Sequence, residues 1–168
     1  NSLVQLNDDL EIIPDLAEQW RISSDGLVYE FRIREDVFFH QHPAFGKSKT
    51  RKVNASDFAF SLKRLLDPQL ASPGGWVLQN VERIEAKNDQ LLIITLKQPF
   101  PAFLGLLSMR YCSVVPKEIV TKTEGDFRKN PIGTGPFAFK NSFICLIGIV
   151  LSDCLSLLIF FLVLLSLI

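Results

Sequence analysis

Two histidines have the chemistry to hold a metal ion. His40 and His42 are separated by one residue, and on an extended strand this spacing puts both imidazoles on the same side. Zinc sites in proteins use three or four ligands, and the sequence around the pair offers no recognisable third ligand. We therefore predict that the pair marks the end of a strand leading into a loop, and that the chain holds no metal.

The run Gly133-Thr134-Gly135 could suggest a loop that cradles a phosphate group. Phosphate loops continue into the start of a helix and carry a lysine there, whereas Pro136 and Phe137 follow here. A tight turn that uses the backbone freedom of glycine explains the run better.

Three carboxylates, Glu11, Asp15 and Glu18, could be considered for general acid–base chemistry. Such chemistry needs a cleft and two groups in opposed environments. We instead predict a short helical turn over residues 14–20, opened by Pro14, with its acids on a solvated face. No Ser-His-Asp arrangement can be proposed either, because both histidines lie in one loop without a nucleophile motif. We predict a protein that is not an enzyme and uses no cofactor.

One aromatic side chain is a candidate for binding rather than packing. Trp76 lies in a loop rich in proline and glycine, and binding residues are often presented by loops. Trp20, Phe31 and Phe58 are more simply predicted to belong to the core.

Composition excludes some classes of protein. The chain has 168 residues, a length that suits one domain, with 18 basic and 18 acidic side chains. This balance leaves no basic surface for nucleic acid. The charges are unevenly placed, because residues 143–168 carry only Asp153 whereas residues 1–142 carry all the lysines and arginines.

The elements that must position these residues follow from periodicity and turn signals. Every second residue over 27–33 is apolar (Leu27, Tyr29, Phe31 and Ile33), whereas the opposite face carries Glu30 and Arg32 beside Val28. This pattern predicts a half-buried strand, and residues 20–22 are its expected antiparallel partner. Asn54 is a good helix N-cap, with Asp57 near the positive helix end and apolar residues at helical spacing after it. The other predicted elements are strands at 3–6, 81–86, 91–96, 111–115 and 137–140, and short helices at 102–107 and 116–122.

Eight segments, in order, resemble the family 5 extracellular solute-binding proteins, the oligopeptide and dipeptide receptors of bacterial ABC importers. Each segment alone is weakly specific, but their shared order covers residues 1–140. The segments are PDLAEQW at 14–20, SDGLVYEF at 24–31, FH at 39–40, NASDF at 54–58, SLKRLLDP at 61–68, LKQPFP at 96–101, VPKE at 115–118 and NPIGTGPF at 130–137.

The resemblance implies an α/β chain with part of a type II periplasmic-binding-protein fold. That fold has two lobes around a ligand cleft and a small extra domain on the first lobe. Residues 1–13 would be a lobe-one segment, 14–131 the small mixed α/β domain, and 132–140 a strand returning to lobe one. The chain would be a truncated receptor without the second lobe, because family members run to several hundred residues.

The resemblance also implies a ligand and partners. An extracytoplasmic peptide would be captured for uptake through the permease subunits of an ABC transporter, at the periplasm or anchored at the outer surface. The residues expected beside the ligand are Asn1, Ser2, Ser72, Pro73, Gly74 and Trp76. Nickel, haem or a sugar are alternative ligands within the same family. A small single-pass membrane or interaction protein without solute binding is the alternative from another class.

The apolar tail, residues 141–168, departs from the family pattern. As a helix, residues 143–168 would span about 39 Å, enough to cross a bilayer. The flanking positive charges precede this span and would keep the rest of the chain cytoplasmic, which contradicts the location of a solute receptor. We therefore favour translation out of frame or past a gene break over an evolved membrane anchor.

Overall fold

The computed structural model describes residues 1–122, 127 and 131–138. The described residues all belong to one compact unit, residues 1–138. Within the described residues, every helix is too short or too polar to cross a membrane. The predicted tail helix at 141–168 lies outside the described residues. The predicted boundaries after residues 13 and 131 stay predictions.

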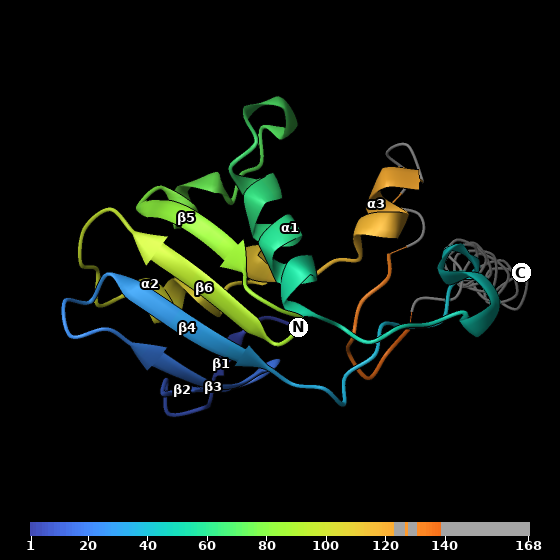
Figure 1. Cartoon of the computed structure of the whole chain (residues 1–168), viewed down its shortest axis with the longest axis horizontal. Helices are drawn as coiled ribbons and strands as arrows, with labels where there is room; N and C mark the ends of the chain where they lie inside the picture. The colour runs from blue at the N-terminus through green and yellow to red at the C-terminus, as the bar shows by residue number, and fades with distance from the viewer. Residues whose placement is uncertain (123–126, 128–130, 139–168) are drawn as a thin grey trace, which may run out of the picture. The chain divides into compact units, whose positions relative to one another are not determined.

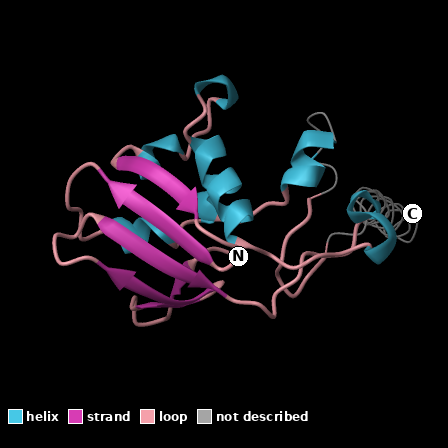
Figure 2. Ribbon diagram, in the orientation of Figure 1, coloured by secondary structure: helices cyan, strands magenta, loops and turns pink. Residues whose placement is uncertain are grey.

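A four-stranded antiparallel sheet is the centre of this unit (Figure 1). Its order is β3-β4-β6-β5, so two hairpins lie side by side through their second strands (Figure 2). The strands are β3 (Ala17–Ile22), β4 (Val28–Ile33), β5 (Val81–Ala86) and β6 (Leu91–Leu96).

The alternation predicted for residues 27–33 is confirmed by the inner face of the sheet. Tyr29, Phe31 and Ile33 of β4 are buried, and Phe31 pairs with Leu92 of β6. Successive side chains of a strand point to opposite faces, so the paired strands place their apolar sets in one core. The Tyr29 and Phe103 rings pack edge to face, with centroids 5.0 Å apart.

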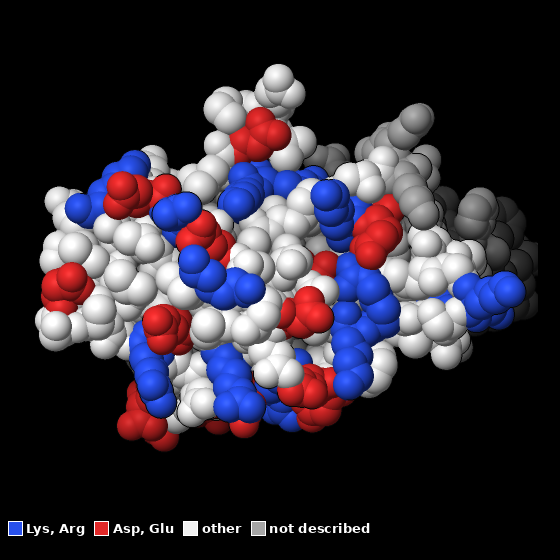
Figure 3. Space-filling view, in the orientation of Figure 1, with Lys and Arg blue, Asp and Glu red and all other residues white. Residues whose placement is uncertain are grey.

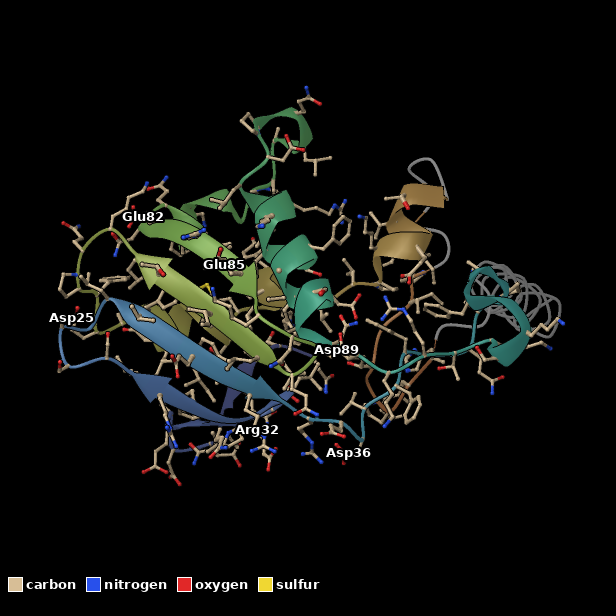
Figure 4. The ribbon with its side chains drawn as sticks, viewed as in Figure 1. Asp25, Arg32, Asp36, Glu82, Glu85 and Asp89 are labelled. Atoms are coloured by element: carbon tan, nitrogen blue, oxygen red, sulfur yellow. The ribbon has the colours of Figure 1, made fainter. Side chains whose placement is uncertain are left out.

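The outer face of the sheet carries charges of both signs (Figure 3). Arg32 comes from β4 and Glu85 from β5 (Figure 4). Arg83 pairs with Glu85 at 2.7 Å and Arg32 with Glu18 at 3.6 Å. Because both arginines and Glu18 are more than half exposed and Glu85 is partly exposed, each pair contributes only a few tenths of a kcal/mol.

Helix α1 (Ala55–Leu65) packs beside β5 and β6 (Figure 1). Its start is a capping box: the Asn54 side chain accepts from the Asp57 N–H, and the Asp57 carboxylate accepts from the Asn54 N–H. Phe58 and Leu62 are fully buried. The predicted N-cap and apolar face are therefore confirmed.

Shorter elements complete the unit. Two strands at the start of the chain pair antiparallel with each other. These elements are β1 (Val4–Leu6), β2 (Ile12–Pro14), α2 (Phe103–Leu107), α3 (Lys117–Lys122) and four 3₁₀ turns, η1 (Pro43–Ser48), η2 (Pro68–Leu70), η3 (Gly75–Leu78) and η4 (Arg110–Cys112).

Two predicted elements are wrong. Residues 14–20 are not a helical turn, because from Ala17 they form β3 and pair with β4. A single helical turn would fix the backbone angles of several residues in return for one hydrogen bond. As a strand, the same residues form a ladder of backbone hydrogen bonds with β4. Residues 111–115 are not a strand. They begin in the 3₁₀ turn η4, and the N–H groups of Val114 and Val115 donate to the Asn1 carbonyl oxygen and to the Ser61 hydroxyl of α1.

The predicted strand at 137–140 is only half covered by the structure. Phe137 and Ala138 are outside any strand, and Phe137 is 90% exposed. Residues 139 and 140 lie outside the described residues.

Candidate functional site

The segment 109–115 lies between the two groups of residues predicted to face a ligand. On one side, Val114 N–H donates to the Asn1 carbonyl oxygen at 3.0 Å, and the Ser2 hydroxyl donates to the Met109 carbonyl oxygen at 3.4 Å. On the other side lies the loop Ser72–Gly74. The segment therefore joins parts of the chain that are far apart in sequence.

Ser61 of α1 holds the end of this segment. Its hydroxyl donates to the Asp57 carbonyl oxygen at 2.7 Å and accepts from Val115 N–H at 2.9 Å. Ser61 is 6% exposed. A buried hydroxyl whose hydrogen bonds are satisfied fixes the backbone it contacts, so α1 positions residues 113–115.

Gly74 allows the Tyr111 ring to lie directly against the backbone of the loop. A Cβ atom at position 74 would lie 2.6 Å from Cγ of Tyr111 and 2.7 Å from its Cβ, distances that real Cβ contacts do not show. Gly74 is buried and Tyr111 is 47% exposed. The absence of a side chain at Gly74 therefore sets the orientation of the Tyr111 ring.

A pocket of about 270 Å³ opens between this loop, the end of α1 and residues 111–115. Four of its side chains carry hydroxyl groups, and Arg64 is its one charged side chain among the described residues. The lining consists of Ser61, Arg64, Leu65, Leu70, Ser72, Pro73, Tyr111, Ser113 and Val115. Hydroxyls and one cation beside an apolar wall suit a small polar ligand with an apolar portion.

The six predicted ligand-facing residues lie in different positions relative to this pocket. Ser72 and Pro73 line it, and Gly74 supports the Tyr111 ring behind it. Trp76 lies in η3 and is 49% exposed, but it is outside the lining. The last two, Asn1 and Ser2, hold segment 109–115 from its other side, and Ser2 is buried.

Asp15 has a role that the sequence interpretation missed. Its carboxylate accepts from the Asn1 side-chain amide at 3.0 Å and from the Ser2 N–H at 2.9 Å. The expectation that Asp15 lies on a solvated helix face is therefore wrong, because the segment is not helical. Asp15 therefore fixes the N-terminal segment by hydrogen bonds, and the Asn1 carbonyl oxygen of that segment accepts from Val114 N–H.

A second cluster fixes α3 against α1. The Arg51 guanidinium forms two hydrogen bonds to Asp57, at 2.6 and 2.7 Å, and two to Glu118, at 2.7 and 2.8 Å. Its carbon lies 5.1 Å from the centroid of the Phe39 ring and 5.6 Å from that of Phe45. The hydrogen bonds to Asp57 are the main reason that the pKa of Arg51 is raised. The network is structural because the guanidinium is engaged by two carboxylates.

The two histidines contact the backbone rather than each other. His40 Nε2 lies 2.6 Å from the Gly135 carbonyl oxygen, and His42 Nδ1 accepts from Ala44 N–H at 3.1 Å as the cap of η1. Among the described residues, no group of three or more His, Cys, Asp or Glu side chains is placed to hold a metal ion.

The Gly-Thr-Gly run differs from its predicted form. Gly133 and Gly135 do not adopt the left-handed backbone that favours glycine, which is found among described glycines at Gly26 and Gly46. The run bends without it, and the Gly133 carbonyl oxygen accepts from His40 N–H at 2.9 Å. Thr134 Oγ1 is buried and has no partner among the described residues.

A hollow of about 390 Å³ on the outer face of the sheet is a less suitable site. Among its lining residues are Arg21, Glu30 and Arg32, side chains of both signs on neighbouring strands. None of the six predicted ligand-facing residues contributes to it. The pocket beside the Ser72–Gly74 loop is therefore the better candidate.

Comparison with known proteins agrees with the predicted resemblance. A model of the bacterial extracellular solute-binding proteins, family 5 Middle, matches residues 11–142. The di/tripeptide-binding protein 2 of Pseudomonas aeruginosa is 40% identical over 144 residues, which cover 76% of this chain and 27% of that protein. The chain thus spans about a quarter of the length of that relative.

Solved structures show the same relationship. The DppA protein of Helicobacter pylori, an ABC transporter-associated periplasmic binding protein solved with the peptide STSA, is 34% identical with a TM-score of 0.72, covering 83% of this chain and 30% of that one. NikZ of Campylobacter jejuni, solved with Ni(L-His), is 33% identical with a TM-score of 0.71, covering 83% and 27%. These matches confirm part of a periplasmic-binding-protein fold, and the chain belongs to the family 5 bacterial extracellular solute-binding proteins.

Proposed function

We propose that this chain contributes to the capture of short peptides for an ABC importer, with the pocket beside Ser72–Gly74 as its contact with the ligand. The observation that carries the proposal is the convergence of the predicted ligand loop and segment 109–115 on one pocket. Relatives named as di/tripeptide-binding proteins support peptides as the ligand class. The role is reversible binding rather than catalysis.

The size of the pocket sets the expected strength of binding. At about 270 Å³ it is smaller than the roughly 300–1,000 Å³ of typical ligand sites, so it encloses one end of a peptide rather than the whole. The peptide still loses translational and conformational freedom. We expect dissociation constants no tighter than about 1 mM, near −4 kcal/mol.

The partners and location follow from the same proposal. Capture for import requires the permease subunits of a transporter, and an extracytoplasmic location such as the periplasm. The relative from Helicobacter pylori, described as a periplasmic binding protein, supports both.

A nickel chelate is the second candidate ligand, because the relative NikZ was solved with Ni(L-His). The described residues offer less support for it. His40 and His42 each contact the backbone, and neither lines the candidate pocket. A chelated metal would have to be recognised through the amino acid rather than through a protein ligand.

The test compares probes on the full chain in a mild detergent. Saturation-transfer NMR would be recorded with a tri- to pentapeptide pool, with free alanine and with Ni(L-His). We expect signal from the peptides, lost in Ser113→Phe, which fills the pocket, and kept in the exposed control Ser24→Phe. Binding of Ni(L-His) without peptide binding, or peptide binding unaffected by Ser113→Phe, would contradict the proposal.

A further inference from the structure

One side of α1 gathers positive charges from two helices. Phe60, Lys63 and Arg64 are three and four residues apart, a spacing that places them on the same side of α1. Lys117, the first residue of α3, reaches the same place. Its Nζ lies 5.9 Å from the centroid of the Phe60 ring, and the guanidinium carbon of Arg64 lies at the same distance. The ring of Phe60 therefore brings cations of α1 and α3 together.

Carboxylates do not neutralise these three cations. None of them forms an ion pair with any residue that the structure describes. The acids next to them in the chain are engaged elsewhere, because Asp67 accepts from Gln69 N–H at 2.9 Å and Glu118 is held by Arg51. A chain with balanced charges thus has a locally positive surface, and Figure 3 shows lysine and arginine side chains gathered over α1 and α3.

Exposed apolar side chains lie beside the cations. The turn that follows α1, residues 66–71, projects away from the sheet (Figure 1). Within this turn Leu66 is 40% exposed and Leu70 48%. Leu70 lines the same pocket as Arg64 and the half-exposed Tyr111. Single exposed apolar residues are ordinary, whereas a group of them marks an interaction surface.

The combination of charge and apolar side chains identifies the chemistry of the partner. Lysine and arginine attract anionic headgroups, and their long stems keep the charge at headgroup level while apolar neighbours reach deeper. Tyrosine suits the same boundary because its ring is apolar and its hydroxyl polar. A nucleic acid or an acidic polypeptide would pair with the cations but would leave Leu66 and Leu70 in water.

We propose that this face of the molecule, called the α1 surface, docks on an anionic lipid bilayer, with the turn 66–71 inserted between the headgroups. The α1 surface consists of Lys63, Arg64, Leu66, Leu70, Tyr111 and Lys117. The proposal goes beyond the proposed function and does not depend on what the adjacent pocket binds. Docking in this way holds the mouth of that pocket at the lipid surface, because Arg64, Leu70 and Tyr111 belong to both.

The test places a nitroxide spin label on the full chain, reconstituted with lipid vesicles. The label is attached at Leu70→Cys in a C145S/C154S background, in which the remaining Cys112 is buried. Ile22→Cys is the matched control, because Ile22 is also an exposed apolar residue, at 45%. It lies on β3, at the opposite edge of the sheet from β5, against which α1 packs.

The lipid composition separates the α1 surface from the apolar tail. Vesicles contain equal parts of phosphatidylglycerol and phosphatidylcholine, or phosphatidylcholine alone. Oxygen and a neutral, water-soluble nickel complex report whether the label lies in lipid or in water. We expect the label at 70 to lie in lipid with the anionic vesicles only, and the label at 22 to stay in water with both. Residues 143–168 carry Asp153 as their one charge, so they give no preference for anionic lipid.

Charge substitutions test which cations hold the turn at the bilayer. Lys63→Gln/Lys117→Gln should shift the equilibrium about 25-fold away from the lipid-bound turn, about fivefold for each cation. Neither residue lines the candidate pocket. Arg21→Gln/Arg32→Gln, on β3 and β4, removes the same charge and should change the equilibrium less than about twofold, since these cations are far from the headgroups.

The outcomes decide between lipid and other partners. Lipid contact at position 70 that needs phosphatidylglycerol and Lys63 with Lys117 supports the proposal. A label that stays in water with both vesicles would overturn it, as would equal lipid contact with neutral and anionic vesicles or an equal loss in the Arg21/Arg32 control. Immobilisation of the label by polyglutamate, without lipid contact in anionic vesicles, would assign the α1 surface to an acidic polypeptide instead.

Discussion

The four-stranded sheet and the candidate pocket are built by different kinds of interaction. In the sheet, buried side chains recur at every second residue, and any apolar residue of suitable size would serve. Around the pocket, single contacts determine the backbone, such as Ser61 with Val115 and Gly74 with Tyr111. The scaffold is therefore encoded by a repeated pattern, whereas the site depends on individual residues.

The largest expected effect is on the sheet. Phe31→Ala removes a fully buried ring from the centre of the core and should lower the free energy of unfolding by about 3–5 kcal/mol. Val28→Ala, on the outer face of the same strand, is the control and should cost less than about 1 kcal/mol. Urea denaturation of both variants measures the difference. Equal losses would show that the two faces of β4 do not differ as described.

The Arg51 cluster should give the next largest effect. Asp57→Ala removes both the capping box of α1 and the carboxylate that faces Arg51, and should cost about 2–3 kcal/mol. Asp36→Ala removes an exposed partner of Arg34 and should cost less than about 0.5 kcal/mol. Thermal unfolding compares them, and a loss for Asp57→Ala as small as that for Asp36→Ala would contradict the structural role of the cluster.

Two glycines should respond in opposite directions. Gly74→Ala forces the Tyr111 ring to move and should lower stability by about 1–3 kcal/mol. Gly105→Ala lies in α2, where an added Cβ meets no atom within 4 Å, and should raise stability by about 0.5–1 kcal/mol through helix propensity. Denaturation curves measure both changes. A neutral Gly74→Ala would mean that the contact with Tyr111 does not shape the pocket.

Cys112 should make the stability of the unit depend on pH. Burial raises the pKa of its thiol from 9.0 to about 12. The unfolded chain then loses this proton before the folded chain does, so the contribution is fully present below pH 9 and is lost progressively between about pH 9 and 12. Between pH 8 and 10 the loss should be about 1.4 kcal/mol.

The thiol prediction is checked in a C145S/C154S background, which leaves Cys112 as the remaining cysteine. Unfolding free energies at pH 8 and 10 would be compared with those of the same chain carrying Cys112→Ala. In the alanine variant, the free energy of unfolding should fall less between pH 8 and pH 10, because the contribution of the Cys112 thiol is absent. Rapid alkylation of Cys112 in the folded chain at pH 8 would contradict its burial.

Much of the scaffold could be predicted from periodicity and from capping signals. The alternation at 27–33, the hairpin at 81–96 and the Asn54 cap are confirmed. The prediction for residues 14–20 is wrong because a proline followed by acidic residues is typical of a helix start. The residues form a strand instead because β4 would otherwise have an unpaired edge. The family could be predicted because its eight segments occur in order.

The site was less accessible from the sequence. Ser72 and Pro73 were placed by the resemblance and line the pocket, but Arg64, Tyr111 and Ser113 were not identified. In the sequence, Arg64 is indistinguishable from a cation on the solvent-exposed face of a helix. Tyr111 and Ser113 lie in the segment 111–115, for which the sequence predicts a strand. Their convergence depends on the contacts of Asn1 with Val114 and of Ser61 with Val115. The partners of each contact lie more than fifty residues apart in the sequence, and no local pattern predicts such contacts.

The most direct test of the account is to map where a short peptide binds along the chain. Ala-Ala would be titrated into the ¹⁵N-labelled full chain in a mild detergent, and the amide shifts followed from residue to residue. We predict weak, saturable shifts at 61–65, 70–74 and 111–115, with the outer face of β3 and β4 unchanged. Shifts confined to the hollow lined by Arg21, Glu30 and Arg32, or no shift at millimolar peptide, would contradict it.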